Sequence, residues 1–377
     1  MTPMGARKLP TIRFTLAILV VCTIATAHAA DTNRAPQIGA LFSSLKPDAP
    51  GAAVLVLEKG NPVFERGYGI TDLRTRHKID ARTNFRLASC TKQFTAMAIM
   101  LLVHDGKLHY DEPLTGVFPE FPAYGKNITI RNLLNHTSGL LDYEDLMQPQ
   151  PGVPEDKLRQ IHDAEVLALL EKQHKTKFGP GSHWDYSNSG YVVLAMVVEK
   201  ASGKSFGDFL HERIFVPLQM NHTIAYEKGK NEVMNRAYGH TAKCGHWTQN
   251  DQSDTSATLG DGGVYSSLED LAKWDRALSQ HALLSETEMQ PAWTAVKVPD
   301  HSVKEPDGKP AAYGFGWFLN PYKTHARMWH YGETVGFRTT IQRFAENNLT
   351  VIILANRDDL VPASLAKRIA DSYLPKP

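Results

Sequence analysis

Strand-like segments lie near both ends of the 377-residue chain, and helical patterns fill the region between them. Two apolar runs, residues 52–57 and 62–69, flank a Gly-Asn turn and predict an early β-hairpin. Strand character returns late, over residues 314–319, 337–344 and 349–356. An apolar sheet face must be covered by another layer, so the helices between have to pack on a sheet built from both ends. The sequence therefore predicts an α+β fold, with a mainly antiparallel sheet flanked by helices and a helical insertion.

The middle of the chain, from residue 107 to about 220, is mostly helical in pattern. The clearest helices are predicted over residues 128–134, 163–172 and 191–200, with a last one over residues 362–374. The polar stretch 236–259 contains His240, Cys244 and His246. Because it offers no fourth clustered ligand and no H-E-x-x-H spacing, we interpret it as a solvated loop rather than a metal site.

Residues 85–102 carry the most informative local pattern. Their apolar side chains recur three and four apart, as on one buried helix face: Phe94, Met97, Ala98, Leu101 and Leu102. Ser89 and Lys92 would lie in the opening turn, where positions i and i+3 share a face. A serine becomes nucleophilic when a base takes its proton, and a lysine can be that base once burial lowers its pKa from about 10.4. Ser89 is therefore a candidate nucleophile.

The Ser-x-x-Lys pattern is weak by itself, because the chain contains it three times. The other two copies are Ser43 with Lys46 and Ser364 with Lys367. Lys46 precedes a proline, where a helix would stop, and Ser364 belongs to a short amphipathic helix. Only Ser89 opens a strongly apolar helix, whose free N–H groups would suit an oxyanion.

Two further segments carry side chains that could serve a serine enzyme. Tyr186 and Asn188 lie in a Gly/Pro-rich loop before a buried helix, and they offer a phenol for proton transfer and an amide for a carbonyl or for Lys92. His330 precedes a predicted strand, and with a pKa near 6.5 it could relay a proton, while Gly332 would let substrate approach the backbone. The structural alternatives are a helix-capping Asn188, a packed Tyr186 and a satisfied His330.

Taken together, Ser-x-x-Lys at Ser89, Tyr-Ser-Asn at Tyr186 and His-x-Gly at His330 are far more specific. The combination resembles the serine β-lactamase and penicillin-binding protein superfamily, in the branch of class C β-lactamases, D-Ala-D-Ala carboxypeptidases, D-aminopeptidases and related esterases. Secondary phrases at residues 133–140 and 262–267 agree, and the resemblance spans residues 40–360.

The resemblance implies a two-step acyl transfer through an acyl-Ser89 intermediate. Lys92 and Tyr186 would both transfer protons during the reaction, and which of them is the general base stays open. The backbone N–H groups of Ser89 and Glu333 would form the oxyanion hole, and Asn188 would orient the substrate.

Departures from the family pattern bear on the substrate. His330 stands where many relatives have a lysine, which favours an esterase or peptidase over an efficient β-lactamase. The Glu333 carboxylate would stand at the mouth of the site and disfavour anionic substrates. A class C-type β-lactamase, and a penicillin-binding or sensor protein that acylates without turnover, remain alternatives.

The first 29 residues have the pattern of a secretory signal peptide. Three basic residues precede an apolar run over residues 14–25, and Ala27-His28-Ala29 matches a cleavage site. The run is too short to span a membrane, which takes about 20 apolar residues. We therefore expect an exported protein, periplasmic or secreted. Residues 31–377 would form a single catalytic domain, with its sheet part at about 31–95 and 255–377 and its helical part at about 96–254.

Composition restricts the partners. The formal net charge is +1 and no basic run occurs beyond the leader, so nucleic acid is not an expected partner. We expect a monomer that acts on a small-molecule or peptide substrate without a cofactor or a metal. Cys90 and Cys244 are expected to be free thiols, because Cys90 lies in the buried helix.

Overall fold

The computed structural model describes residues 34–299, 303–305 and 308–376. The predicted signal peptide, residues 1–29, lies outside the described residues. Residues 34–40 are helical and belong to a separate small unit, and one compact unit runs from residue 41 onward.

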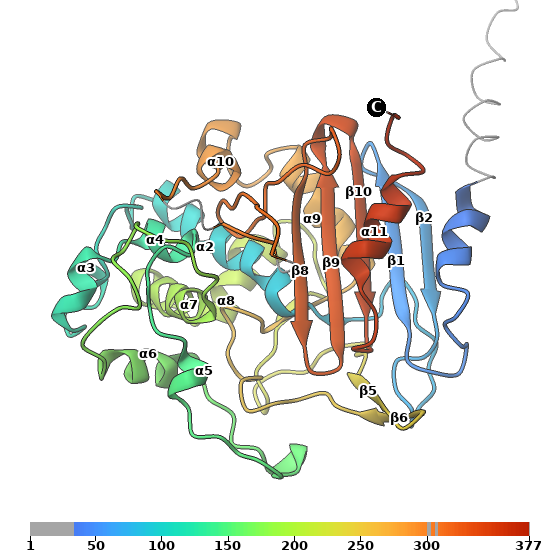
Figure 1. Ribbon diagram of the computed structural model, residues 1–377, viewed down its shortest axis with the longest axis horizontal. Helices are drawn as coiled ribbons and strands as arrows, with labels where there is room; N and C mark the ends of the chain where they lie inside the picture. Colours follow the sequence, from blue (N-terminus) through green and yellow to red (C-terminus); the bar gives the residue numbers. More distant parts are fainter. Residues whose placement is uncertain (1–33, 300–302, 306–307, 377) are drawn as a thin grey trace, which may run out of the picture. The chain divides into compact units, whose positions relative to one another are not determined.

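A five-stranded antiparallel sheet is built from the two ends of the chain (Figure 1). Its order is β2-β1-β10-β9-β8, so the first strand pairs with the last one in the register Val54↔Ile353. The strands are β1 Ala52–Glu58, β2 Asn61–Tyr68, β8 Met328–Thr334, β9 Phe337–Phe344 and β10 Leu349–Ala355. The antiparallel α+β fold predicted from the sequence is confirmed.

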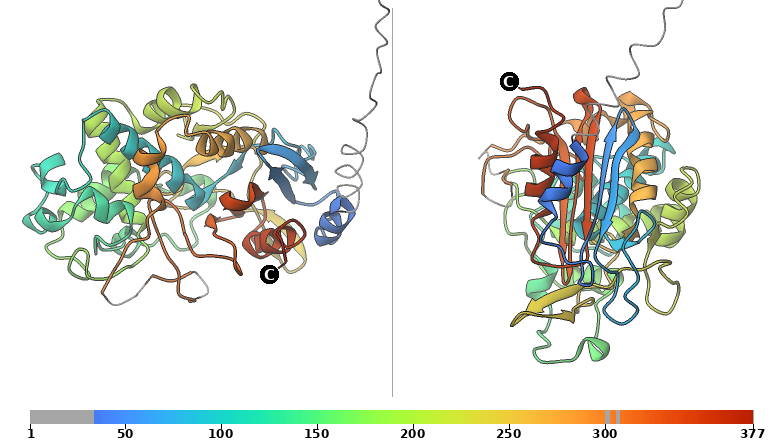
Figure 2. Two further views of the ribbon diagram at one scale, coloured as in Figure 1. Left: turned by 90° about the horizontal axis from the view of Figure 1, so that it is seen from above. Right: turned by 90° about the vertical axis from the view of Figure 1, so that its right-hand side faces the viewer.

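Helices cover both faces of this sheet, as the right panel of Figure 2 shows. Successive strand residues point to opposite faces, and the neighbours Gln342 and Arg343 illustrate this. Gln342 Nε2 donates to the Ala363 carbonyl of α11 (Pro362–Ala370) at 3.0 Å. Arg343 Nε donates to Asp275 Oδ1 of α9 (Leu268–Ser279) at 2.6 Å. One strand therefore binds two helices on opposite sides.

The helical part lies beyond α9 and is centred on α2 and α7, which pack against each other (Figure 1). The α7 helix begins where Ser187 Oγ accepts the Gly190 N–H, and it ends at Gly203 with a left-handed φ of 72°. The α-helices of this part are α2 Lys92–His104, α3 Leu114–Val117, α4 Ile130–Leu134, α5 Tyr143–Leu146, α6 Asp163–Glu171, α7 Asn188–Ser202, α8 Phe206–Leu210 and α10 Glu286–Trp293. Residues 88–91 form a 3₁₀ turn, and β3 Phe85–Arg86, β4 Ile224–Ala225 and β7 Val264–Ser266 form a small sheet.

Two predictions about local structure are wrong. Residues 314–319 are not a strand: Gly316 takes a φ of 77°, and only isolated bridges occur there in the described residues, from Phe318 to Tyr313 and to Trp329. The polar stretch read as a loop contains a hairpin, β5 His240–Lys243 and β6 His246–Gln249. Its turn residues Cys244 and Gly245 both have positive φ, as a two-residue type I′ turn requires. A Cys-Gly turn is not the usual sequence signal for such a hairpin.

The two cysteines in the described part of the chain are free, as expected, with Cys90 buried and Cys244 exposed. Burial raises the pKa of the Cys90 thiol to about 12, which keeps this thiol protonated and unreactive. In the described ranges, no helix is long and apolar enough to cross a membrane.

The ion pair between Arg343 and Asp275 ties the sheet to α9, and both side chains are nearly inaccessible. We expect Asp275→Ala to lower the free energy of unfolding by about 3–5 kcal/mol, because it leaves a buried guanidinium without its carboxylate. Denaturant unfolding of the two proteins measures the difference. The exposed pair of Lys204 and Glu212 is the matched control, and Glu212→Ala should cost no more than about 1 kcal/mol. Equal losses in the two variants would contradict the assigned role of the buried pair.

Candidate active site

Ser89 lies in the 3₁₀ turn Ala88–Thr91, immediately before α2. The sequence predicted it in the first turn of the α-helix itself, so the helix begins a few residues later than expected, at Lys92. The turn starts with a strained residue, since Ala88 has a φ of 48°. The turn packs against β8, the edge strand of the large sheet, and against β9.

Lys92 is fully buried and its amine has three partners. The Nζ atom lies 3.0 Å from Ser89 Oγ, 2.9 Å from Asn188 Oδ1 and 3.0 Å from the Asp261 carbonyl oxygen. A neutral amine can donate to the two carbonyl-type oxygens and keep its lone pair for the serine proton. Burial lowers the pKa of Lys92 to about 8, although nearby Asp261 partly offsets this effect. A useful fraction of Lys92 is therefore neutral near pH 8.

Tyr186 lies over this amine, with the centre of its ring 4.8 Å from Lys92 Nζ. Its hydroxyl oxygen is buried, and it forms no hydrogen bond of good geometry within the described part of the chain. Burial raises the pKa of Tyr186 well above its usual value, and the neighbouring Ser89 hydroxyl opposes this shift. The phenol consequently stays protonated, which suits a proton donor better than a resting base.

His136 holds Tyr186 in place, and the sequence analysis missed it. The centre of its ring lies 4.4 Å from that of Tyr186 and 4.6 Å from that of Tyr313, with both pairs tilted, and its Nδ1 accepts the backbone N–H of Ser187 at 3.1 Å. Burial lowers the pKa of His136 well below 6.5, so the ring is a neutral acceptor. The signal was present in the sequence, because His136 lies within residues 133–140, a phrase that supports the family resemblance.

His330 occupies β8 and is fully buried. Its Nδ1 donates to the Tyr331 carbonyl at 2.6 Å, so Nε2 is left to accept from the Tyr313 hydroxyl at 3.2 Å. Burial lowers the pKa of His330 to about 3, and the nearby Lys92 charge acts in the same direction. The expectation of a titration near pH 6.5 is therefore wrong, since the site holds this imidazole neutral at ordinary pH.

The sequence suggested that Gly332 lets substrate approach the backbone, but in the structure this glycine allows close packing within the protein. A Cβ atom here would lie 2.1 Å from the Leu87 carbonyl oxygen and 2.3 Å from Thr339 Oγ1. The missing side chain thus lets β8 approach the segment that leads into the Ser89 turn. Glu333 follows with an exposed side chain, 3.9 Å from Arg338 Nε.

Ser89, Asn188 and Glu333 line one cavity of about 320 Å³. Lys92 and Tyr186 lie against Ser89, and His330 lies behind them, with its ring 6.1 Å from the Tyr186 ring. A larger hollow of about 580 Å³, beside α9 and the β9–β10 turn, contains none of these residues. The structure thus brings together the candidate groups from the three sequence segments at the smaller cavity.

A family model described as Beta-lactamase matches residues 35–374, nearly the whole chain. The chain belongs to this β-lactamase family. Within the family, it is similar to penicillin-binding protein 4* of Bacillus subtilis, with 31% identity over 87% of this chain and 73% of that protein.

A solved structure of a penicillin-binding protein from Bacillus halodurans has a TM-score of 0.72 and 27% identity, covering 89% of this chain and 99% of that one. The D-aminopeptidase of Brucella canis is 27% identical to this chain. The match covers 81% of this chain and 56% of that enzyme. This β-lactamase family is one of serine hydrolases, so the chain has the fold of a serine hydrolase.

We expect Gly332→Ala to lower kcat/KM by about a hundredfold. The added methyl group would push β8 away from Leu87 and displace the Ser89 turn, and a 1 Å shift of a reacting group costs about that much. Hydrolysis of a p-nitrophenyl ester measures the change. Gly179→Ala is the control, because a Cβ atom there meets only Ser182 Oγ, at 3.7 Å. Wild-type activity in the Gly332 variant would refute the packing role.

Proposed function

We propose that this protein is an exported serine hydrolase that cleaves an ester, amide or D-amino-acid peptide bond through an acyl-Ser89 intermediate. The single observation that carries the proposal is the buried Lys92 amine, 3.0 Å from Ser89 Oγ and without a carboxylate partner in the described residues. Such an amine can take the serine proton as the hydroxyl attacks.

In the acylation step, Ser89 Oγ bonds to the substrate carbonyl carbon while Lys92 receives the serine proton. The bond from that carbon to the leaving oxygen or nitrogen then breaks, and Tyr186 passes a proton to the leaving group. Lys92, whose Nζ lies 4.8 Å from the centre of the Tyr186 ring, passes the serine proton on to Tyr186. The backbone N–H groups of Ser89 and Glu333 hold the oxyanion, and Asn188 orients both substrate and Lys92.

In the second step, water attacks the acyl carbon and Ser89 recovers its proton, which releases the carboxylic acid. Lys92 is the base in this proposal, because its pKa lies near 8 while that of Tyr186 lies well above 10. His330 is a neutral positioning group that orders Tyr313 behind Tyr186 and His136.

Two alternative functions would share the acylation of Ser89 with the main proposal. They differ from it in the substrate or in the release of the product. The similarity to penicillin-binding protein 4* favours a protein that acylates on Ser89 and releases product slowly. A class C-type β-lactamase would use the same residues on a cyclic amide. For either alternative and for the main proposal, residues 1–29 would direct the chain to the periplasm or the outside.

We expect Ser89→Ala to reduce hydrolysis of an activated ester by roughly a thousandfold or more, because the acyl acceptor is gone. Mass spectrometry of the Ser89 peptide should show an acyl adduct in the wild-type protein alone. Ser364→Ala is a matched control, since Ser364 also opens a Ser-x-x-Lys sequence but lies on α11. Retention of full activity by Ser89→Ala would eliminate the proposed function. A single burst of product would favour the slow-releasing alternative.

The pH dependence of acylation follows from Lys92. Below its pKa the ammonium cannot accept the serine proton, so kcat/KM for a neutral ester should rise with pH and level off above about 8. We also expect Lys92→Arg to lose at least about a hundredfold in activity, because a guanidinium stays charged across this range. Rates between pH 5 and pH 9.5 test this. An inflection near pH 6.5 in place of the one near 8 would contradict the assignment of Lys92 as the base.

A further inference from the structure

The side-chain amide of Asn188 can face Lys92 in two ways, and one of them suits the reaction. Oδ1 accepts hydrogen bonds and Nδ2 donates them, although the two ends have nearly the same shape. In the structure Oδ1 faces Lys92 at 2.9 Å, so a neutral amine donates to the amide and keeps its lone pair for the Ser89 proton. With the amide reversed, Nδ2 would donate to that lone pair and block the base.

Glu144 lies on the other side of this amide. Its Oε1 accepts from Asn188 Nδ2 at 3.4 Å, and both residues line the Ser89 cavity. Glu144 is exposed at the rim of the cavity, so its carboxyl group is ionised at the pH where Lys92 titrates. An ionised carboxylate accepts hydrogen bonds and donates none. It can therefore bind Nδ2 but not Oδ1, which selects the orientation that leaves the lone pair free.

Hydrogen bonds between the starts of α5 and α7 hold Glu144 against Asn188. Tyr143 donates its backbone N–H to Ser189 Oγ at 2.9 Å, and Ser189 Oγ donates to the Leu141 carbonyl at 2.8 Å. Tyr143 and Ser189 are the chain neighbours of Glu144 and Asn188. The bonded pair therefore brings the carboxylate and the amide together.

The loop between β6 and β7, residues 250–263, belongs to the same frame. The Tyr143 hydroxyl donates to Asp261 Oδ2 at 3.2 Å, which ties α5 to this loop. Arg86 is 4% exposed and supports the loop from its other side, where Nε donates to the Gly262 carbonyl at 3.2 Å and Nη2 donates to the Ser256 carbonyl at 3.0 Å. The loop therefore gives α5 a fixed support.

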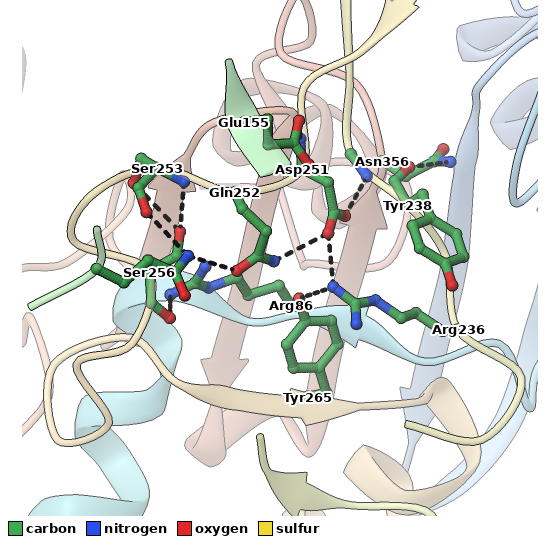
Figure 3. A network of polar contacts seen from close by, with 12 residues as sticks. Arg86, Glu155, Arg236, Tyr238, Asp251, Gln252, Ser253, Ser256, Tyr265 and Asn356 are labelled. Carbon is green, nitrogen blue, oxygen red and sulfur yellow. Dashed lines mark hydrogen bonds and ion pairs between the residues drawn. The ribbon is translucent and has the colours of Figure 1, made fainter. Parts of the chain in front are cut away.

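The segment that follows α5 is anchored to the same loop. Glu155 Oε2 accepts the backbone N–H of Asp251 at 3.1 Å, and Asp251 forms an ion pair with Arg236. Figure 3 shows this network, in which Arg86 reaches Ser256 and Arg236 reaches Asp251. Because α5 and the chain after it are both bound, Glu144 lies on a fixed helix rather than on a free loop.

The charge of Glu144 also acts on Lys92. Three carboxylates influence this amine without pairing with it: Asp261, Glu144 and Asp142. The other titratable groups that face it are Cys90, His136, Tyr186, Tyr191 and His330. Burial lowers the pKa of Lys92 and the carboxylates oppose this effect, so loss of the Glu144 charge would lower that pKa further. Burial raises the pKa of Glu144 itself, and so do the charges of Asp142, Asp261 and Asp254.

We propose that Glu144 is a positioning residue for the acylation of Ser89. It holds the Asn188 amide with Oδ1 toward Lys92, so that the neutral amine keeps its lone pair for the serine proton. Glu144 acts through Asn188 and does not touch the reacting atoms. This inference rests on the proposed function and adds a residue to its machinery.

Glu144→Gln tests the orientation, because glutamine has the same length but can present either an oxygen or an amide N–H to Asn188. We expect the alkaline plateau of kcat/KM for a neutral p-nitrophenyl ester to fall about three- to tenfold, since part of the Asn188 amide turns. The inflection near pH 8 should move down by about 0.2–0.7 pH unit, because a negative charge near the ammonium is gone. Rates between pH 5 and pH 9.5, corrected for hydrolysis by Ser89→Ala, measure both changes.

The two effects of Glu144→Gln oppose each other on the acid side of the profile, so the loss of activity should be confined to alkaline pH. A merely structural defect would instead lower the rate equally at every pH without moving the inflection, and that result would overturn the inference. Asp145→Asn is the matched control, because it makes the same charge change at the next position of α5, at an exposed residue outside the cavity lining. It should leave the plateau and the inflection unchanged.

A double-mutant cycle shows whether Glu144 acts through Asn188. An Asn188→Ala protein has no amide to orient, so adding Glu144→Gln to it should not lower the plateau further. An equal loss in the two backgrounds would mean that Glu144 acts on the substrate or the fold directly, and the positioning role would be wrong. A wild-type plateau in Glu144→Gln alone would also exclude it.

The outcomes separate this inference from the proposed function. If the wild-type protein hydrolysed the ester through Ser89 with an inflection near pH 8 and Glu144→Gln behaved in the same way, the proposed function would stand and only the role of Glu144 would fail. Ester hydrolysis that did not depend on Ser89 would remove the proposed function itself.

Discussion

The buried amine of Lys92 is the constraint on which the rest of the site depends. An ammonium in an apolar interior is costly, and this one has hydrogen-bond acceptors but no carboxylate within pairing distance in the described residues. The fold meets the cost by supplying Ser89, Asn188 and the Asp261 carbonyl from three separate segments. Each of these segments is itself fixed: by the 3₁₀ turn, by the N-terminus of α7 and by the loop over Arg86.

The aromatic layer around this amine explains why the histidines are structural rather than titrating groups. His136 and His330 bracket Tyr186 and Tyr313, and both rings are buried and neutral. A charged imidazole here would repel Lys92 as well as lose its hydration. The layer therefore keeps one basic nitrogen at the site, with the Tyr186 ring over it, and the Tyr186 hydroxyl has no hydrogen-bond partner in the described part of the chain.

The sequence predicted those features of the fold and the site that depend on residues close together in the chain. The i, i+3 relation of Ser89 and Lys92, the β1–β2 hairpin and the buried α7 all follow from periodicity, and the structure shows them. Strand β8 was not predicted, because its mixture of His, Tyr, Gly and Glu has no clear alternation and its conformation comes from pairing with β9. The packing role of Gly332 depends on Leu87, distant in sequence, and so could not be read from neighbouring residues.

The pairing of β1 with β10 has a consequence for how such a chain comes to be folded. Ala52 pairs with Ala355, so almost all of the protein must leave the ribosome before this pairing can form. Only then does β10, the central strand, have both of its neighbours. Until then the β1–β2 hairpin presents an apolar, unpaired edge, which is a target for association with other chains. Contacts of such long sequence separation also make folding slow. Assembly of the sheet, and with it the positioning of β8 beside Ser89, is therefore a late event that a truncated chain cannot complete.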